Sequence, residues 1–546
     1  MHERYDVVVI GSGFGGAVVA CRLAQAGRSV AVLERGRRWD RSEFPRAIGQ
    51  LADGAFWEEG RSHGFLEYAA FRKLDVIQGA GVGGGSLHYF NVNIPADASI
   101  FTDRRWPAAI TRATLDPYYE AALDMLESKA LRPPPGRTAL PERTVAFLEA
   151  GRAAGYPTEP VTIAVHAEAA RANPVTGLTQ NPCTYCGNCL FGCDIGAKNT
   201  LDTNYLARAE HGGGAEIFPL HQVDSIAPAG GGNGYEVRFR RFDADDPRAP
   251  GTAGRVVADN VVVSAGAVGS TALLLACRDR HATLPQLPDA LGQRFSLNGE
   301  FLFAFAHDVT RRTDPGLGPP ITGRATIRTA DHLLTVQDLG LPDSLLWYLE
   351  GVLPPHIGRL RGIAALLTSY AKRTIGIGSR TSRLSLELDA IVSGARTPHA
   401  IPFLGMGTDS SDGRVRLDGD SLDIEWSPAR NRQLYKEMVK AMTAISEAAG
   451  GHFSTSFLYR WPMRKILTAH PLGGCAMGDD PATSVVNDRG EVWGHPGLYV
   501  VDGSMMSSAL AVNPSLTIAA LAERAAQWMV HGREVSRPDH TVVLNR

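Results

Sequence analysis

Apolar runs, glycine turns and helical spacing follow one another at the start of the chain in the order of an α/β fold. YDVVVI, residues 5–10, is a short β-branched run, GSGFGG follows it, and AVVACRLAQAG carries small and apolar residues at helical spacing. This pattern predicts a strand, a tight turn and a helix, and SVAVLERG predicts a second strand. Near the C-terminus, LYVVDGSMMSSALAVNPSLTIAALAERAA predicts a strand that ends at Asp502-Gly503, a loop, and a helix from about Ser515.

The middle of the chain, residues 300–460, has a different pattern. RLSLELDAIV alternates as a strand does, and VRLDGDSLDIEW predicts two strands about a turn at Asp418-Gly419, so we expect a mostly antiparallel sheet. Between these strands and the preceding region, LPDSLLWYLEGVLPPHIGRLRGIAALLTSYAKR carries apolar residues at helical spacing, broken by Pro354-Pro355. It is interpreted as a surface helical pair, as a mobile lid over an apolar cavity, or as an entry that touches a membrane.

Composition and charge narrow the function classes. The chain has 546 residues, 44% of them hydrophobic, and a formal net charge of -2. Its Lys and Arg residues are scattered, so we expect no nucleic-acid partner and no strongly anionic membrane surface, and small neutral substrates instead. No run of 18 apolar residues predicts a membrane span, and MHERYDVVVI leads directly into a strand without room for a signal peptide. The expected location is the cytoplasm.

The first strand, turn and helix predict a dinucleotide site. Gly11, Gly13 and Gly16 have the GxGxxG spacing, which lets the backbone approach a pyrophosphate at the helix N-terminus. Glu34 ends the second strand, where a carboxylate can accept hydrogen bonds from both ribose hydroxyls of an adenosine. The alternative is a βαβ unit whose glycines serve packing alone.

A second glycine-rich stretch favours FAD over NAD. IQGAGVGGGSLHYFNVNIP has five glycines between Gly79 and Gly85, too many for a helix or a strand. It predicts a loop whose backbone approaches a ligand, as an extended FAD requires at two separate places; the alternative is a flexible linker. The helix near Ser515 can direct its positive end at a reduced flavin, and His470 and Asn513 both stand where a side chain faces a cofactor.

These segments together resemble a known family. GSGFGG, GAGVGGGSLHYFNV, HPLGG at 470–474 and VDGSMMSSALAVNPSLTIAALAER are similar to the glucose-methanol-choline (GMC) flavoprotein oxidoreductases, in particular their cholesterol-oxidase-like branch, and LGQRFSLNGEF and VVVSAGAVGST match further pieces. The resemblance implies an α/β fold with an FAD-binding Rossmann-like lobe and a substrate lobe built on a mostly antiparallel sheet plus helices. The implied boundaries are 1–100, 200–300 and 460–546 for the FAD lobe, 101–199 for a connecting region, and 301–459 for the substrate lobe with a lid-like segment at 341–373.

The resemblance also implies site residues. His470 would act as acid and base on the substrate hydroxyl beside the flavin, and Asn513 would hydrogen-bond the same oxygen. The residues implied to bind FAD are Gly11, Gly13, Gly16 and Glu34 at the ADP half, Val223 at the adenine, and Gly83, Gly84, Asn91, Gly266, Asp502, Gly503 and Thr517 nearer the flavin. Cholesterol oxidases of this type also use a Glu for steroid isomerisation, but the corresponding stretch here, ARTPHAIP, holds no carboxylate.

The expected reaction is the oxidation of a hydrophobic alcohol, sterol-like or terpenoid-like, by hydride transfer to the flavin. A non-oxidative lyase or isomerase reaction on the same fold, or a flavin-binding protein without catalysis, is the alternative. The presence of both His470 and Asn513 favours alcohol oxidation.

Four cysteines form the remaining motif. Cys183, Cys186, Cys189 and Cys193 have the CxxCxxCxxxC spacing of a bacterial ferredoxin run, although Asp194 stands where such runs have Pro. The spacing predicts an iron–sulfur cluster, [3Fe–4S] or [4Fe–4S], with structural or redox thiols and zinc as alternatives. GAKNT is also similar to the end of a cluster-binding stretch in some sugar dehydrogenases of the same superfamily. A cluster would send electrons to a redox protein or quinone; without one, oxygen is the natural acceptor and hydrogen peroxide the product.

Overall fold

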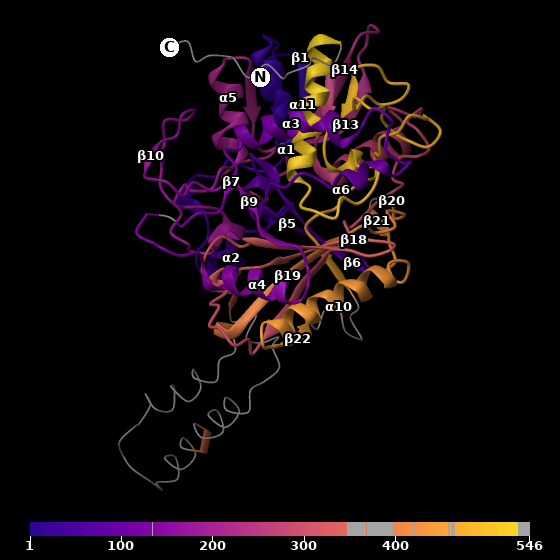
Figure 1. Ribbon diagram of the computed structural model, residues 1–546. Helices are drawn as coiled ribbons and strands as arrows, with labels where there is room; N and C mark the ends of the chain where they lie inside the picture. The colour runs from indigo at the N-terminus through magenta and orange to yellow at the C-terminus, as the bar shows by residue number, and fades with distance from the viewer. Residues whose placement is uncertain are drawn as a thin grey trace.

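Two lobes, one built on a parallel sheet and one on an antiparallel sheet, make up the molecule (Figure 1). The structure is a computed structural model that describes residues 1–133, 135–346, 367–368, 397–419, 421–456, 459 and 465–532. We call the upper part in Figure 1 the parallel lobe and the lower part the antiparallel lobe.

The parallel lobe begins with the predicted strand–turn–helix. β1 (Arg4–Ile10) leads through the glycine turn into α1 (Phe14–Gln25), and β2 (Val30–Leu33) returns beside β1. β1 and β2 are buried along most of their length, α1 packs on both of them, and α11 packs on α1 in turn. Its other elements are β12 (Ala215–Phe218), β15 (Thr252–Val263), β24 (Leu498–Val500), the antiparallel extension β14 (Tyr235–Arg241) and β13 (His221–Pro228), α3 (Arg112–Met125), α6 (Gly266–Leu275) and α11 (Ser515–His531).

The strands of this sheet come from the three ranges that the sequence assigns to one lobe. β1 and β2 belong to the first range, β12 to β15 to the second, and β24 to the last, where it pairs with the end of β15. Chain segments more than 200 residues apart therefore meet at the carboxyl ends of the parallel strands, the edge at which α/β sheets bind ligands.

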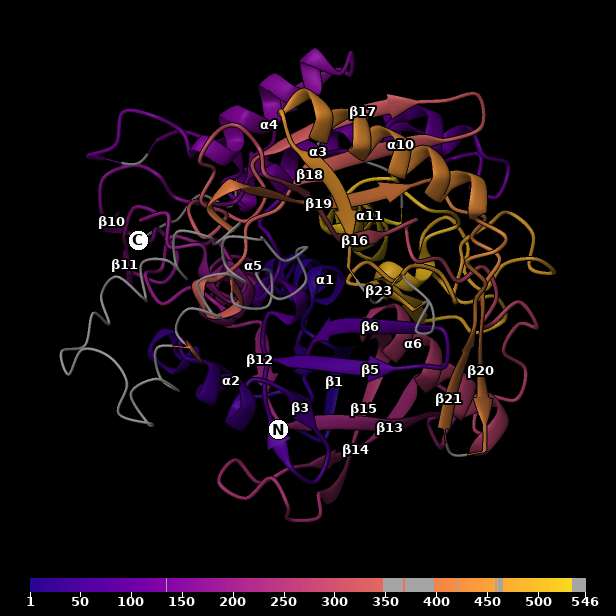
Figure 2. The same cartoon turned by 90° about the horizontal axis from the view of Figure 1, so that it is seen from below.

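The antiparallel lobe has the sheet order β22-β16-β19-β18-β17-β8. Figure 2 shows β16, β19, β18 and β17 of this sheet side by side. Its outer face packs on α10 and α4 through a core of Leu, Ile, Phe and Met side chains. The predicted antiparallel sheet is confirmed, although its last strand comes from the connecting region. The elements are β16 (Phe301–His307), β19 (Ala400–Gly407), β18 (Leu333–Asp338), β17 (Gly323–Arg328), β22 (His452–Thr455), β8 (Thr158–Pro160), α4 (Glu142–Ala153) and α10 (Arg432–Ala448).

Smaller elements complete the described part of the chain. The predicted hairpin is confirmed as β20 (Arg414–Asp418) and β21 (Ser421–Glu425), and a small sheet pairs β6 (Leu74–Gly79) with β5 (Leu66–Ala70) and β23 (Ile466–Thr468). The others are α2 (Ile48–Gly54), α5 (Tyr205–His211), β3 (Trp57–Glu58), β4 (Ser62–His63), β7 (Lys129–Ala130), β9 (Thr162–Ile163), β10 (Arg171–Ala172) and β11 (Thr179–Gln180).

Two predictions fall on residues that the structure does not describe. The strand RLSLELDAIV lies outside the described residues, and so does most of the lid-like segment 341–373. Within the described part of the chain, every helix is too short or too polar to span a lipid bilayer.

Candidate active site

A cavity of about 890 Å³ lies where the two lobes meet. Its wall includes the glycine turn after β1, the loop after β6, the starts of three helices, and side chains of the antiparallel sheet. Of the residues predicted to bind the cofactor or to act in catalysis, those that line this cavity are Gly11, Gly13, Glu34, Gly84, Val223, Gly266, His470, Asp502, Gly503 and Asn513.

Three helices begin at the cavity wall. α1 begins after Gly13, α6 after Ala265 and α11 after Pro514, and none of these three residues caps its helix with a side chain. At α6 the Gly266 amide donates a hydrogen bond to Asp502 Oδ2 at 2.8 Å, so this helix start is already paired with a carboxylate. The N–H groups and the positive dipole ends of α1 and α11 lie at the cavity wall, an arrangement that binds phosphate and other anionic groups.

Close backbone contacts explain why glycine stands at several positions of these loops. A Cβ atom on Gly84 would lie 2.7 Å from the Cα atom of Gly13, and one on Gly15 would lie 1.6 Å from the carbonyl oxygen of Val501. The two glycine loops and the β24 end thus pack backbone against backbone. Cβ atoms on Gly13 and Gly266 would meet nothing within 4 Å, so these two positions leave room for a ligand.

Glu34 is held at the end of β2 by the glycine turn. Its Oε2 accepts hydrogen bonds from the Ser12 amide at 3.0 Å and the Ser12 hydroxyl at 2.6 Å, and its Oε1 accepts one from the Gly36 amide at 2.9 Å. Burial raises the pKa of this carboxyl. Ser12 was not among the predicted residues, and it fixes the orientation of the carboxylate that faces the cavity.

His470 lies on the loop after β23, against Glu300. Glu300 Oε2 accepts hydrogen bonds from the Thr468 hydroxyl at 2.6 Å, the Ala469 amide at 2.8 Å and the His470 amide at 3.1 Å. His470 Nδ1 lies 3.3 Å from the same oxygen, a long contact of the kind that shortens when a substrate binds. Both side chains line the cavity, and Glu300 was not among the predicted residues.

Asn513 is oriented from two sides. Gln337 on β18 donates a hydrogen bond from Nε2 to Asn513 Oδ1 at 2.8 Å, which leaves the Asn513 amide nitrogen to donate elsewhere. The preceding residues are fixed by Asn298, whose Oδ1 accepts hydrogen bonds from the Leu510 and Ala511 amides and whose Nδ2 donates to the Val512 carbonyl. Neither Gln337 nor this function of Asn298 was predicted.

The antiparallel sheet contributes an apolar roof. Leu302 of β16 is paired with Leu404 of β19, and Leu404 is paired in turn with Gln337 of β18. Because paired residues share one face of a sheet, these three side chains form one row across it. Both leucines line the cavity, and Gln337 reaches it through Asn513.

Four predicted residues do not line the cavity. Gly16 serves packing, since a Cβ there would lie 2.1 Å from the carbonyl oxygen of Gly11. Gly83 has a φ of 105°, and its amide donates a hydrogen bond to Ser12 Oγ. Asn91 is fully buried and has a φ of 66°. Thr517 Oγ1 is hydrogen-bonded to the Tyr119 hydroxyl. These residues support the wall from behind.

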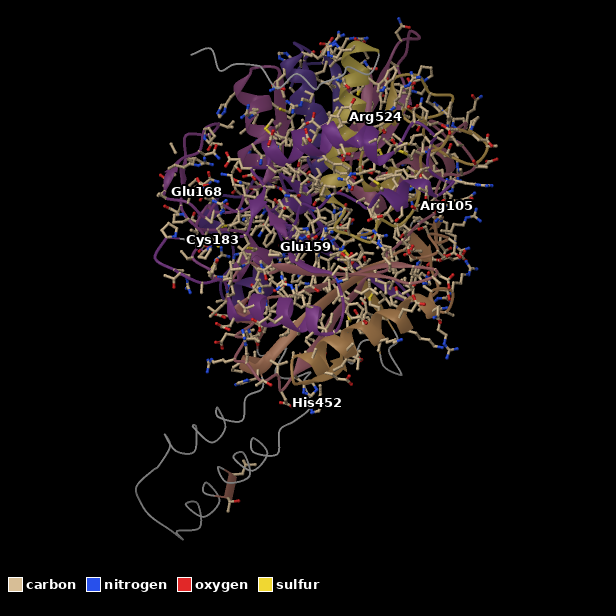
Figure 3. All side chains as sticks on the ribbon, in the orientation of Figure 1. Arg105, Glu159, Glu168, Cys183, His452 and Arg524 are labelled. Carbon is tan, nitrogen blue, oxygen red and sulfur yellow. The ribbon has the colours of Figure 1, made fainter. Side chains whose placement is uncertain are left out.

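The four cysteines lie on a loop at the side of the molecule, where Figure 3 labels Cys183. They line a cavity of only about 10 Å³, which has room for at most one water molecule. Within the described residues, no group of three or more His, Cys, Asp or Glu side chains could hold a metal ion. The iron–sulfur site predicted at Cys183, Cys186, Cys189 and Cys193 therefore does not fit this arrangement.

A buried lysine lies against the cysteine loop. Lys198 Nζ donates hydrogen bonds to the carbonyl oxygens of Leu87 and Cys189, each at 2.9 Å, and burial lowers the pKa of this ammonium group to about 8. Burial also raises the pKa of the Cys189 thiol to about 12, so at neutral pH this side chain is a neutral thiol. The loop also packs tightly, because a Cβ on Gly192 would lie 2.2 Å from the Phe44 ring.

Comparison with known proteins agrees with this geometry. Family models described as GMC oxidoreductase match residues 5–294 and 409–522. The chain is 32% identical to a cholesterol oxidase of Mycobacterium tuberculosis, over 98% of this chain and 93% of that protein, and 30% identical to a cholesterol oxidase of Acinetobacter baumannii, over 96% and 94%. The crystal structure of pyridoxine 4-oxidase from Mesorbium loti has a similar fold, with a TM-score of 0.60 at 18% identity, over 97% of this chain and all of that one.

Proposed function

Because the chain belongs to the GMC oxidoreductase family, it is an FAD-dependent enzyme acting on CH–OH groups, and we propose that its substrate is a sterol or another apolar alcohol. The observation that carries this proposal is the meeting of His470 and Asn513 under an apolar roof in one cavity. The names of the two most similar relatives reported above support a sterol-like substrate.

The cavity fits FAD through its backbone as much as through its side chains. The glycine turn and the free N-terminus of α1 would hold the pyrophosphate, Glu34 the adenosine ribose, and the start of α11 the flavin end. When bound, FAD supplies the two-electron acceptor for the hydride that leaves the carbinol carbon.

His470 and Asn513 would handle the substrate hydroxyl between them. A neutral imidazole is a good acceptor for the hydroxyl proton near neutral pH. Asn513, whose Oδ1 is occupied by Gln337, would present its amide N–H groups to the same oxygen and hold it in place. Leu302 and Leu404 would exclude water and contact the carbon skeleton.

We propose oxygen as the electron acceptor, with hydrogen peroxide as the product. The relatives described above are named oxidases, which supports this acceptor. The tight cysteine cavity supports it as well, because a relay through an iron–sulfur cluster would need space that the loop does not offer.

The test is anaerobic mixing of the FAD-loaded enzyme with cholesterol, a long-chain alcohol and glucose. We expect cholesterol or the long-chain alcohol to bleach the flavin absorption, glucose to leave it unchanged, and air to restore it with release of hydrogen peroxide. Bleaching by glucose alone would overturn the apolar-substrate proposal. A flavin that no alcohol reduces would overturn alcohol oxidation itself.

Replacement of the ribose-facing carboxylate should weaken cofactor binding. We expect Glu34→Ala to raise the FAD dissociation constant by about 10- to 100-fold, the usual effect of removing hydrogen bonds to a charged group. Titration of apoprotein by flavin fluorescence measures this change. Glu216→Ala is the control, because Glu216 lies on the neighbouring strand β12 and not in the cavity wall, and it should bind FAD as the wild type does. Equal affinity of Glu34→Ala and wild type would mean that Glu34 does not contact the cofactor.

The cysteine loop gives a second prediction. Protein purified without oxygen should contain full FAD and no iron or acid-labile sulfide above background, because the cavity that the four cysteines line is too small for a cluster. Elemental analysis and EPR of the dithionite-treated protein measure this. Two or more iron atoms per flavin would reinstate the cluster that the cysteine spacing predicts.

A further inference from the structure

We propose that Glu300 is the positioning residue of His470: its carboxylate keeps the proton on Nδ1 and so leaves Nε2 free to accept the substrate hydroxyl proton. The inference rests on the proposed function, because it assigns a task within the same alcohol oxidation. It concerns a residue that precedes β16 and lies 170 positions before His470 in the chain.

The contact geometry supports this assignment. The Glu300 side chain is 1% exposed and that of His470 is 15% exposed, so the pair is shielded from water. The amides of Ala469 and His470 both donate to Glu300 Oε2, which anchors the His470 backbone to the carboxylate that its ring faces. Nδ1 is buried, has no hydrogen-bond partner among the described residues and lies 3.3 Å from this oxygen. A carboxylate this close stabilises the Nδ1–H tautomer and the imidazolium that forms on proton transfer.

The Glu300 carboxylate can accept more hydrogen bonds than the 468–470 loop donates to it. All three hydrogen bonds from the 468–470 loop go to Oε2, whereas Oε1 is buried and has no partner among the described residues. A buried charge with a free oxygen is costly when it serves only to shape a loop. Its position in the wall of the reaction cavity indicates a task there.

Three other titratable groups lie near His470 or Glu300, and none of them places a further negative charge beside the His470 ring. His88 lies near the His470 ring, and burial lowers its pKa to about 3, so it stays neutral. Lys198 lies beyond His88, with a pKa lowered to about 8, and its ammonium is turned toward two carbonyl oxygens. Tyr435 faces Glu300 from α10, and burial raises its pKa well above the ordinary value, so it too is neutral.

The Glu300→Gln variant removes the negative charge of the Glu300 side chain and keeps its shape. In Glu300→Gln the amide oxygen can still accept from the 468–470 loop, so the turn should persist while the negative charge is lost. We expect the rate of flavin reduction by the alcohol to fall by about 10- to 100-fold with a much smaller change in KM.

A double-mutant cycle tests whether Glu300 acts through His470. In a His470→Ala background, Glu300→Gln should have almost no further effect on flavin reduction, because the ring it positions is gone. The FAD dissociation constant and thermal unfolding temperature of Glu300→Gln should match those of the wild type. An unchanged rate of flavin reduction in Glu300→Gln, or a full additional loss in the His470→Ala background, would overturn the proposal.

A measurement on the wild-type holoenzyme makes the test independent of turnover and of the folding of Glu300→Gln. In protein labelled with ¹⁵N at histidine, the ring signals that vanish in His470→Ala identify His470. We expect their shifts to report the Nδ1–H tautomer, the opposite of the form usual in water. An Nε2–H tautomer would overturn the positioning role even if alcohols reduce the flavin. An Nδ1–H tautomer in an enzyme that oxidises no alcohol would leave the positioning intact and overturn the proposed reaction instead.

Discussion

The His470→Ala variant should keep its FAD and lose about 10²- to 10⁴-fold of the rate of flavin reduction, the range expected when a general base is removed. The ring is the group in the cavity wall that Glu300 holds ready to accept the hydroxyl proton. Asn513 and its partner Gln337 remain, so substrate binding should change far less than the chemical step. Stopped-flow reduction under anaerobic conditions measures that step directly.

An exposed histidine supplies the control for this variant. His452 lies on β22 at the far end of the antiparallel lobe, where Figure 3 labels it. Its replacement by Ala should leave flavin reduction unchanged. Wild-type reduction by His470→Ala with FAD bound would remove His470 from the mechanism and direct attention to the other polar groups of the cavity.

Local pattern was enough to predict much of the fold. The β-branched run, the glycine turn and the helical spacing lie next to one another in the chain, so β1 and α1 follow where they were predicted. The turn at Asp418-Gly419 and the helix start at Ser515 are local features too, and both are confirmed. β8 was missed because a three-residue strand has no periodicity to detect, and it is defined only by its pairing with β17.

The supporting residues of the site could not be found in this way. Glu300 meets the His470 amide across 170 positions, and Gln337 meets Asn513 across 176. No local sequence pattern encodes such contacts. The one local signal was a polar residue beside or within an apolar strand: Glu300 in NGEF and Gln337 in LLTVQD. The cysteine spacing has a related limit, since it cannot tell how much room the folded loop leaves beside the four cysteines, where the structure has Lys198 near Cys189 and a cavity of only about 10 Å³.

Gln337 depends on a buried ion pair at the next position of β18. Asp338 Oδ2 accepts a hydrogen bond from Arg143 Nε at 2.9 Å, and both side chains are 0% exposed. Asp338 Oδ1 also accepts from the Thr322 and Gly323 amides, and the remaining Arg143 donors bind loop carbonyls of residues 315–320. One pair therefore ties α4, β17 and β18 together directly behind the side chain that orients Asn513.

Asp338→Ala should lower the free energy of unfolding by about 3–5 kcal/mol, the cost of leaving a buried charge without its partner. The Glu159–Arg324 pair of the same sheet is the control: the Glu159 side chain is 58% exposed, so Glu159→Ala should cost no more than about 1 kcal/mol. Urea unfolding followed by tryptophan fluorescence compares the two variants, and flavin reduction measured below the transition should fall only in Asp338→Ala, because β18 carries Gln337. Equal stability of the two variants would mean that the buried pair does not hold the roof of the active site, and that Gln337 is positioned by packing against Leu404 instead.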